Sequence, residues 1–263
     1  MSLPRSLGAP LAIAGGAGAL LLSVMFAQAL HMNKIMPRFP PAEGPGEGVV
    51  GDGLPTFRVV LLGESTVAGT GAPTHEQALS GRMAAMVAEE TGQTVSWRAL
   101  GRNGVTAAVC AARLAPALEG DRADLLVVSL GVNDIILVNG PHRFTDGMHR
   151  LIETARGHLG DEVPVLVSGV PPLGCFPAFP QPLRTLVHLR SRQFDRALRA
   201  MVDCLPNVWH VPIPFRGDQT CFSADRFHPS PIGYALWAEL MRPTLRQVLT
   251  SLGAAAPRWG VRV

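Results

Sequence analysis

The 263-residue sequence contains almost no lysine and no recognisable metal-binding pattern. Lys34 is the only lysine, so the net charge of +3 depends on dispersed arginines. Without a basic run or an aromatic-basic stripe, nucleic-acid binding has little support. The four cysteines show no C-x-x-C or Cys/His spacing of the kind that binds metals. We therefore expect neither a metal site nor a cofactor.

Three familiar site motifs are also missing. The nucleophile-elbow pattern G-x-S-x-G occurs nowhere in the chain. Gly63 is not followed by the Gly-Lys-Ser/Thr of a phosphate-binding loop, and Gly69-Thr70-Gly71 lacks the third glycine of a dinucleotide fingerprint. These absences exclude the most common nucleotide-binding and α/β-hydrolase signatures.

The cysteines leave the redox compartment open. Cys204 and Cys221 flank the last predicted strand, and a disulfide between them would fit an oxidising compartment. Buried free thiols are an interpretation at least as good, because Cys110 lies within a predicted helix and buried cysteine behaves as a small apolar residue. Cys175 is the fourth cysteine.

The first 31 residues form a separate hydrophobic segment. From Ala9 to Leu30 the chain carries no charge over 22 residues, enough for a helix to cross a hydrocarbon core of roughly 30 Å. Ala27-Gln28-Ala29 resembles a signal-peptidase site, but the apolar stretch exceeds the usual signal core of about 7–15 residues. A retained membrane anchor is favoured over an exported, cleaved form, and the flanking charges leave its orientation undecided. Residues 32–55, rich in Pro and Gly, are predicted to be a tether.

Beyond Pro55, short apolar runs alternate with segments of helical length. The expected strands are Phe57–Leu62, Val95–Leu100, Leu125–Leu130, Val163–Ser168 and Val208–Ile213, and the expected helices are Gln77–Thr91, Thr106–Leu118, Thr145–Leu159, Leu186–Cys204 and Ser230–Leu252. This alternation predicts an α/β domain over residues 56–253, with a five-stranded parallel sheet between helices, followed by a tail at 254–263. In such a fold the functional groups gather at the carboxyl ends of the strands.

Ser65, Gly104 and Asn133 each follow a predicted strand. A serine after a strand is usually a turn or helix-capping residue. Here Gly63 relieves crowding ahead of Ser65, and the small residues up to Gly71 would let a substrate carbonyl approach the hydroxyl. Ser65 is therefore a candidate nucleophile.

The segment Gly131-Val132-Asn133-Asp134 has two interpretations. An Asn-Asp pair at a strand end is often a turn that caps itself. Alternatively, the Asn133 amide donates a hydrogen bond to a developing oxyanion, with Gly104 supplying a backbone N–H to the same oxygen. Asp134 is expected to brace the loop.

His228 differs from the other seven histidines in its sequence context. Asp225 stands three residues before it, so a tight loop would place a carboxylate against one imidazole nitrogen. The other nitrogen would then take the proton of Ser65. Asp225 as a helix-capping residue is the alternative.

These motifs, in this order, resemble the GDSL/SGNH hydrolase family from about Phe57 to Leu252. The resemblance implies a flavodoxin-like three-layer αβα sandwich and metal-independent ester cleavage. It also implies that Ser65, His228 and Asp225 form the catalytic triad, and that Ser65 N–H, Gly104 N–H and the Asn133 side chain form the oxyanion hole. Glu64 departs from the family, which usually has Asp at this position, and the triad does not require that side chain.

The substrate remains open at this stage. The stiff loop Val170–Leu183 carries Phe176 and Phe179, which either line an acyl or alcohol pocket or simply pack on the domain. The residues fit an esterase, lipase-like enzyme or thioesterase acting on a small-molecule or lipid ester. They fit equally an O-acyltransferase with the same triad, whereas an intact triad argues against a non-catalytic binding module.

Overall fold

Five short runs form the centre of the fold, and the middle three are rich in Val and Leu because a parallel strand covered on both faces needs apolar side chains on both sides. The structure is a computed structural model that describes residues 8–35, 39–216 and 218–253, with the backbone alone for residues 8–19, 33 and 35. The runs form β2 (Phe57–Gly63), β3 (Val95–Gly101), β4 (Leu125–Ser129), β5 (Val165–Ser168) and β6 (Val208–Val211). All five are parallel, in the order β3-β2-β4-β5-β6. The five predicted strands are confirmed.

A sixth strand makes the sheet mixed and corrects the expectation of a purely parallel one. β1 (Glu47–Val50) pairs antiparallel with β3 at the edge of the sheet, with Val50 opposite Val95. It lies inside residues 32–55, the segment predicted as a tether. Only four residues long, with exposed and half-buried positions alternating, this edge strand carries too little apolar signal to stand out among Pro and Gly.

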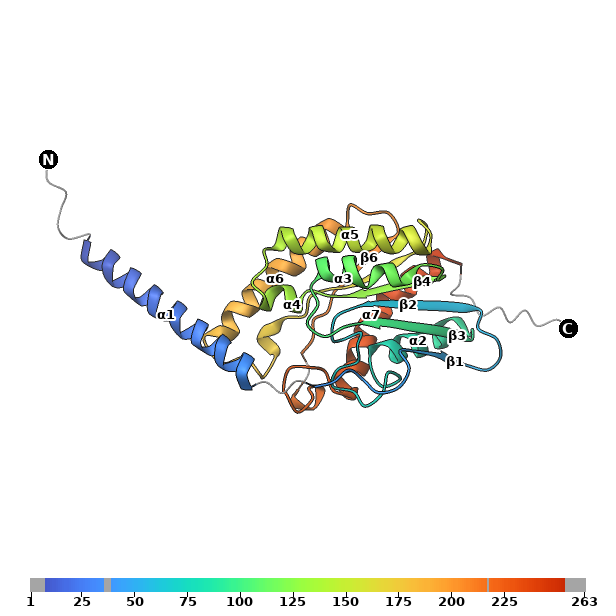
Figure 1. Ribbon diagram of the computed structural model, residues 1–263, viewed down its shortest axis with the longest axis horizontal. Helices are drawn as coiled ribbons and strands as arrows, with labels where there is room; N and C mark the ends of the chain where they lie inside the picture. The colour runs from blue at the N-terminus through green and yellow to red at the C-terminus, as the bar shows by residue number, and fades with distance from the viewer. Residues whose placement is uncertain (1–7, 36–38, 217, 254–263) are drawn as a thin grey trace.

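Helices cover both faces of the sheet. In Figure 1, α2 (Leu79–Thr91) and α7 (Pro231–Ser251) lie on one face, while α3 (Ala107–Arg113), α5 (Pro141–Leu159) and α6 (Leu183–Val202) lie on the other. The short helix α4 (Val132–Ile136) follows β4, and 3₁₀ turns occupy Ala115–Leu118, Leu173–Cys175 and Gln219–Cys221. The α/β layering expected from the sequence is therefore present.

The strand order identifies where a ligand would bind. From β2 the chain moves to β3 on one side and then crosses to β4 on the other, so the order reverses between β2 and β4. In open α/β sheets the loops at such a reversal diverge and leave a crevice at the carboxyl ends of the strands. Ser65 follows β2 and Asn133 follows β4, so both candidate residues lie beside this crevice.

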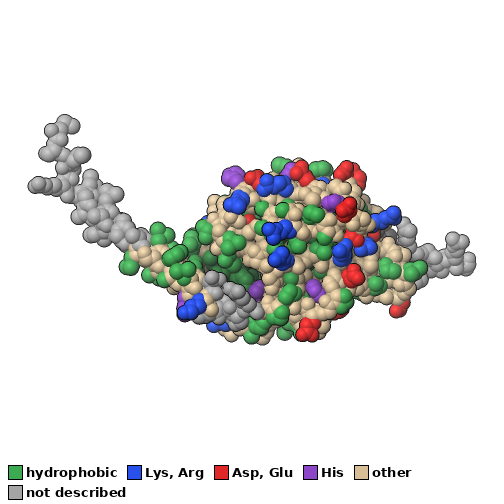
Figure 2. Space-filling model, viewed as in Figure 1, with side chains coloured by type: hydrophobic (Ala, Val, Ile, Leu, Met, Phe, Trp, Pro, Cys, Tyr) green, Lys and Arg blue, Asp and Glu red, His purple; other side chains and the backbone are tan. Residues whose placement is uncertain are grey.

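The helix α1 (Gly8–Ile35) extends away from the sandwich (Figure 1). Its inner side is held by Gln28, whose Nε2 donates to Gln181 O at 2.7 Å and whose Oε1 accepts from Leu183 N at 3.2 Å. Several outward side chains are apolar and exposed, including Leu20 and Phe26 at 68% and 66%. Figure 2 shows this hydrophobic surface where α1 leaves the domain.

The predicted anchor Ala9–Leu30 lies partly outside the residues whose side chains are described. Within the described part of the chain, no helix has the length and apolar character needed to cross a membrane. The predicted tail at 254–263 lies outside the described residues altogether.

All four cysteines are free thiols. Cys110 and Cys221 are buried, whereas Cys175 and Cys204 are exposed. Of the two interpretations of the cysteines, the structure has the free thiols, and no disulfide joins Cys204 to Cys221.

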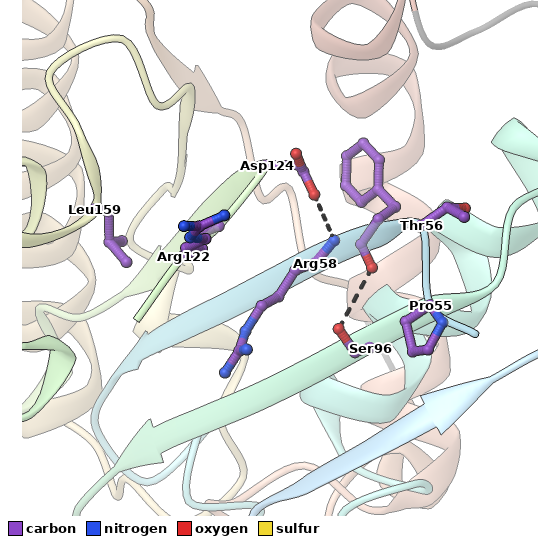
Figure 3. A pocket seen from close by; sticks show the side chains of 9 residues that line it. Pro55, Thr56, Arg58, Ser96, Arg122, Asp124 and Leu159 are labelled. Atoms are coloured by element: carbon purple, nitrogen blue, oxygen red, sulfur yellow. Dashed lines mark hydrogen bonds between the residues drawn. The ribbon is translucent and has the colours of Figure 1, made fainter. Parts of the chain in front are cut away.

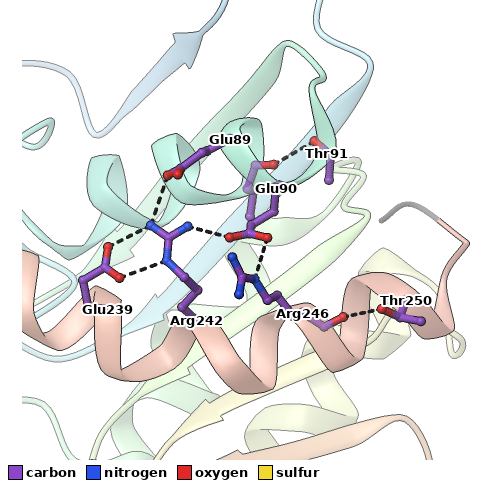
Figure 4. Close-up of polar contacts among 8 residues, drawn as sticks. Glu89, Glu90, Thr91, Glu239, Arg242, Arg246 and Thr250 are labelled. Atoms are coloured by element: carbon purple, nitrogen blue, oxygen red, sulfur yellow. Dashed lines mark hydrogen bonds and ion pairs between the residues drawn. The ribbon is translucent and has the colours of Figure 1, made fainter. Parts of the chain in front are cut away.

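A network of ion pairs ties α2 to α7. Arg242 of α7 donates to Glu90 at 2.5 Å, Glu89 at 3.0 Å and Glu239 at 2.8 Å (Figure 4). Arg246 adds a second contact to Glu90 at 2.8 Å. The Arg242 and Glu90 side chains are only 18% and 13% exposed, so these charges are less screened by solvent than an ordinary surface pair.

We predict that Arg242→Ala lowers the free energy of unfolding by about 1–2 kcal/mol, because it removes three ion pairs from a partly buried network. Arg246→Ala is the matched control. Its side chain is 62% exposed and makes one pair, so its loss costs about 0.5 kcal/mol or less. Urea denaturation of both variants measures the difference, and equal effects would contradict a special role for Arg242.

Candidate active site

The loop after β2 lies directly against the ends of two neighbouring strands. A Cβ at Gly63 would stand 2.3 Å from Ser129 O of β4, and a Cβ at Gly101 would stand 2.1 Å from Ala68 N. Any larger residue at either position would force the backbones apart. These two glycines thus allow the Ser65 loop to pack against both β3 and β4.

Ser65 lies at the start of this loop and is 9% exposed. Its carbonyl accepts a hydrogen bond from Thr70 N at 3.0 Å, which closes the turn. Among the described residues, neither its N–H nor its hydroxyl makes a hydrogen bond. Both groups are therefore free to interact with a substrate.

Gly104 lies on the neighbouring loop, which follows β3. Its φ of +78° is in the left-handed region, and no atom lies within 4 Å of the place where a Cβ would stand. Thr70 Oγ1 donates to Asn103 Oδ1 at 2.6 Å, which joins this loop to the Ser65 loop. Within the described chain the Gly104 N–H has no acceptor, so it too can bind a substrate oxygen.

Asn133 lies in the first turn of α4, where helix N–H groups lack partners within the helix. Glu64 supplies an acceptor from another element: its Oε1 accepts from Val132 N and its Oε2 from Asn133 N, both at 3.0 Å. Oε2 also accepts from the Asn133 side-chain Nδ2 at 2.6 Å. The second hydrogen of that amide lies toward Val105 O at 3.2 Å. Glu64 therefore fixes both the helix start and the amide of Asn133.

The structure also explains Asp134. Its Oδ2 accepts from Ala107 N at the start of α3 at 2.9 Å, and its Oδ1 accepts from Asn139 Nδ2 at 2.9 Å. It is 1% exposed and joins α3 to the α4 loop. This is the bracing role that the sequence predicted.

Glu64 is 2% exposed, and its electrostatics are unusual for a carboxylate. Burial raises the pKa of Glu64 to about 7, although the N–H groups of Asn133 and Val132 act in the opposite direction. The negative charge of Asp134 raises it further. At neutral pH this carboxyl group is therefore divided between its charged and neutral forms.

Asp225 and His228 form the pair expected from their spacing. His228 Nδ1 lies 2.5 Å from Asp225 Oδ2, and Asp225 Oδ1 accepts from His228 N, Phe227 N and Ser223 Oγ. Burial alone would raise the pKa of Asp225, but the hydrogen bonds from His228, Phe227 and Ser223 outweigh it and hold the pKa below its usual value. Asp225 is therefore ionised at neutral pH and orients the imidazole. Arg226, at φ +61°, makes the tight turn between them.

The His228 loop lies beside the Ser65 loop. A Cβ at Gly71 would stand 2.4 Å from Pro229 O and 3.2 Å from the His228 Cβ. The fully buried Tyr234 donates its hydroxyl to Thr70 O at 2.7 Å, which fastens α7 to the Ser65 loop. No hydrogen bond joins Ser65 to His228 within the described chain; catalytic contacts of this kind often tighten only when substrate binds.

Phe176 and Phe179 lie in an aromatic cluster and are 3% and 4% exposed. Both contact Phe227, with ring centroids 5.7 Å and 5.8 Å away, and Phe227 lies edge-on to His228 at 5.0 Å. Both rings therefore pack on the domain against Phe227, the residue that contacts the histidine. Their role in substrate binding stays a prediction.

Two features of the molecule were missed from the sequence. Asp195 of α6 lies 2.9 Å from His210 Nε2, so His210 also has a carboxylate partner, although no local spacing signals it. Glu64 contacts Asn133 across 69 positions of sequence. In both cases the partners come together only through the fold.

A hollow of about 750 Å³ lies at the opposite end of the sheet. It is lined by residues at the amino ends of β2, β3 and β4, among them Arg58, Ser96 and Asp124 (Figure 3). Asp124 Oδ2 accepts from Arg58 N at 2.7 Å, so part of its polar lining is already paired. The candidate residues at the carboxyl ends do not line this hollow.

The chain is similar to known proteins over most of its length. Residues 61–236 match the model of the GDSL-like lipase/acylhydrolase family. The chain is 32% identical over 250 residues to the GDSL-like esterase Rv1075c of Mycobacterium tuberculosis, covering 87% of this chain and 77% of the relative.

Solved structures show the same fold. The lipase Lip_vut3 from a goat rumen metagenome aligns with a TM-score of 0.59 at 19% identity, covering 77% of this chain and 99% of its own. A family 3 carbohydrate esterase of Clostridium thermocellum aligns with a TM-score of 0.58 at 18% identity, over 76% and 99% of the two chains.

We predict that Glu64 makes stability fall as pH rises from about 4.5 to 7. In this interval folded Glu64 keeps its proton and unfolded Glu64 loses it, so folding takes up a proton. Relative to Glu64→Gln, the free energy of unfolding of the wild type should decrease by up to about 3 kcal/mol across the interval. Urea denaturation of both proteins at pH 4.5 and pH 8 measures this change, and a constant difference between them would contradict the prediction.

Proposed function

The chain belongs to the GDSL-like lipase/acylhydrolase family of carboxylic ester hydrolases, and we propose that it cleaves esters through a Ser65–His228–Asp225 triad and an acyl-enzyme. The proposal is supported by two adjoining loops at one end of the sheet: one carries the Ser65 hydroxyl, which makes no hydrogen bond within the described chain, and the other carries His228 oriented by Asp225. The backbone N–H groups of Ser65 and Gly104, which have no acceptor among the described residues, and the Asn133 amide lie at the same end.

The first step is attack on the ester carbonyl. Because Asp225 is ionised, His228 Nδ1 carries the hydrogen that it donates, and Nε2 is left to accept a proton. Nε2 takes the proton of Ser65 as Oγ bonds to the carbonyl carbon. The negative charge that develops on the carbonyl oxygen is stabilised by Ser65 N–H, Gly104 N–H and Asn133 Nδ2.

The second step releases the products. His228 returns the proton to the departing alcohol oxygen as its bond to the carbonyl carbon breaks. Water then attacks the acyl carbon while His228 takes a proton from it, and His228 returns that proton to Ser65 Oγ as the Oγ–carbon bond breaks and the carboxylic acid leaves. No metal or cofactor is required by these steps.

Ser65→Ala should reduce turnover of p-nitrophenyl esters at least about 1,000-fold, since it removes the nucleophile. His228→Asn should have a similar effect, because the proton acceptor is lost. His210→Asn is the matched control: it removes a histidine that is also paired with a carboxylate, but one outside the proposed triad, and should keep activity within about 3-fold.

The same assay tests the acyltransferase alternative. Turnover that depends on Ser65 and yields free acid supports the hydrolase. Ser65-dependent formation of a new ester from an added alcohol, with little free acid, would favour acyl transfer. Folded wild-type protein that acts on no ester, or a Ser65→Ala variant that keeps its activity, would contradict the proposal.

We also propose that α1 holds the protein at a membrane. The support comes from the uncharged stretch Ala9–Leu30 and from the exposed apolar side chains on the described part of α1. Replacing Leu20, Leu22 and Phe26 together by Asp should move the full chain from the membrane pellet to the soluble fraction. Leu54→Asp, at a position 88% exposed elsewhere on the surface, is the control. If the wild type is soluble and mass spectrometry shows that it begins at Leu30, the segment is a cleaved signal instead.

A further inference from the structure

The side chain of Glu64 is not one of the proposed triad or oxyanion groups, yet it is the most heavily engaged carboxylate beside them. It accepts three N–H groups, two from the α4 backbone and one from the Asn133 side chain. The shortest of these contacts, at 2.6 Å, is the one to Asn133 Nδ2. Capping the helix start needs only the two backbone contacts, so the contact to the side chain of the proposed oxyanion donor is additional to the cap.

The planar amide of Asn133 makes this contact directional. When one Nδ2 hydrogen points to Glu64, the direction of the other is fixed by the amide plane. That second hydrogen lies toward Val105 O at 3.2 Å, a longer contact than the one to Glu64, on the residue that follows Gly104. A substrate oxygen would take this hydrogen by replacing Val105 O as its acceptor.

We propose that Glu64 is a positioning residue, an inference that rests on the proposed function. As a carboxylate, Glu64 holds one hydrogen of the Asn133 amide and so directs the other toward the substrate oxygen. Protonation removes the negative charge that strengthens all three contacts, and it places an O–H on one of the two carboxyl oxygens. Protonation therefore weakens the hold of Glu64 on the Asn133 amide, and the direction of the oxyanion donor is less strictly fixed.

The surroundings of Glu64 make this protonation accessible near neutral pH. From α4, Asp134 places a second negative charge beside it. From α3, Cys110 faces it as a neutral thiol, because burial raises the pKa of that thiol to about 12. From β4, the Ser129 carbonyl accepts from Glu64 N, and the Ser129 hydroxyl is paired with that of Thr66. The groups that act on Glu64 in the described structure include no cation, so its N–H partners offset burial only in part and its pKa stands at about 7.

Steady-state kinetics of the full chain test the role of Glu64. Glu64→Gln should lower kcat about 10- to 100-fold with KM within about 3-fold, because the donor acts on the transition state more than on bound substrate. Glu64→Asp keeps the charge on a shorter side chain and should recover most of the lost kcat. Loss of activity in both variants alike would leave no case for a positioning carboxylate and would overturn the proposal.

The acid limb of the pH profile adds a readout that a purely structural role would not move. Protonation of Glu64 should make kcat/KM of the wild type fall more steeply below about pH 7 than that of Glu64→Gln, until the additional loss reaches the roughly 10- to 100-fold by which that variant is itself reduced. Asp134→Asn is the matched control. It removes a neighbouring negative charge and should move the steeper part of the limb to lower pH with little loss of maximal activity. An acid limb equally steep in the wild type and in Glu64→Gln would overturn the proposal.

Nuclear magnetic resonance of the Asn133 side-chain amide separates this inference from the proposed function. The amide signals, assigned from their absence in Asn133→Asp, should shift with a midpoint near pH 7 in the wild type and stay constant in Glu64→Gln. If the Asn133 amide signals shift with pH but the protein has no Ser65-dependent turnover, the hydrolase mechanism is contradicted while the contact between Glu64 and Asn133 is supported. If Ser65-dependent turnover is present but the amide signals do not shift with pH, only the positioning role of Glu64 is overturned.

Discussion

The structure depends on one close approach, between the loop that follows β2 and the carboxyl ends of β3 and β4. Gly63 and Gly101 have no space for a Cβ, since backbone atoms of the adjacent segments lie 2.3 Å and 2.1 Å from where it would stand. Because the loops are packed backbone to backbone, Ser65, Gly104 and Asn133 come from three strands and still lie at one place. Regular strand pairing, rather than a flexible loop, therefore positions the polar groups.

Two buried carboxylates beside this crevice show how environment assigns different behaviour to similar groups. Asp225 accepts bonds from His228, Phe227 N and Ser223, and these hold its pKa below the usual value despite burial. Glu64 also accepts three N–H groups, but deeper burial and the charge of Asp134 raise its pKa to about 7. One carboxylate is charged throughout the neutral range and the other titrates within it, so of these two groups only Glu64 changes its charge there.

The segment before the domain takes part in building the site. Ala42 N donates to Ala68 O of the Ser65 loop at 2.9 Å, and Asn103 Nδ2 donates to Phe39 O at 3.1 Å on the Gly104 side. β1 then joins the sheet edge beside β3. The segment 32–55, which the composition predicted to be a tether, is thus bound to both loops that carry candidate residues. Pro and Gly there permit an extended path along the surface, which composition alone does not distinguish from a loose linker.

The sequence by itself determined the five parallel strands, the helices between them and the placement of Ser65, Gly104 and Asn133 after strands, because apolar periodicity and turn residues act over short spans. It also determined the Asp225–His228 pair, whose members are three residues apart. Only the tertiary structure decided the contact between Glu64 and Asn133, the pairing of His210 with Asp195, the packing of Phe176 against Phe227 and the edge position of β1. The physical reason is distance along the chain: Glu64 and Asn133 are 69 positions apart, and only the crossover that places β4 beside β2 brings them into contact.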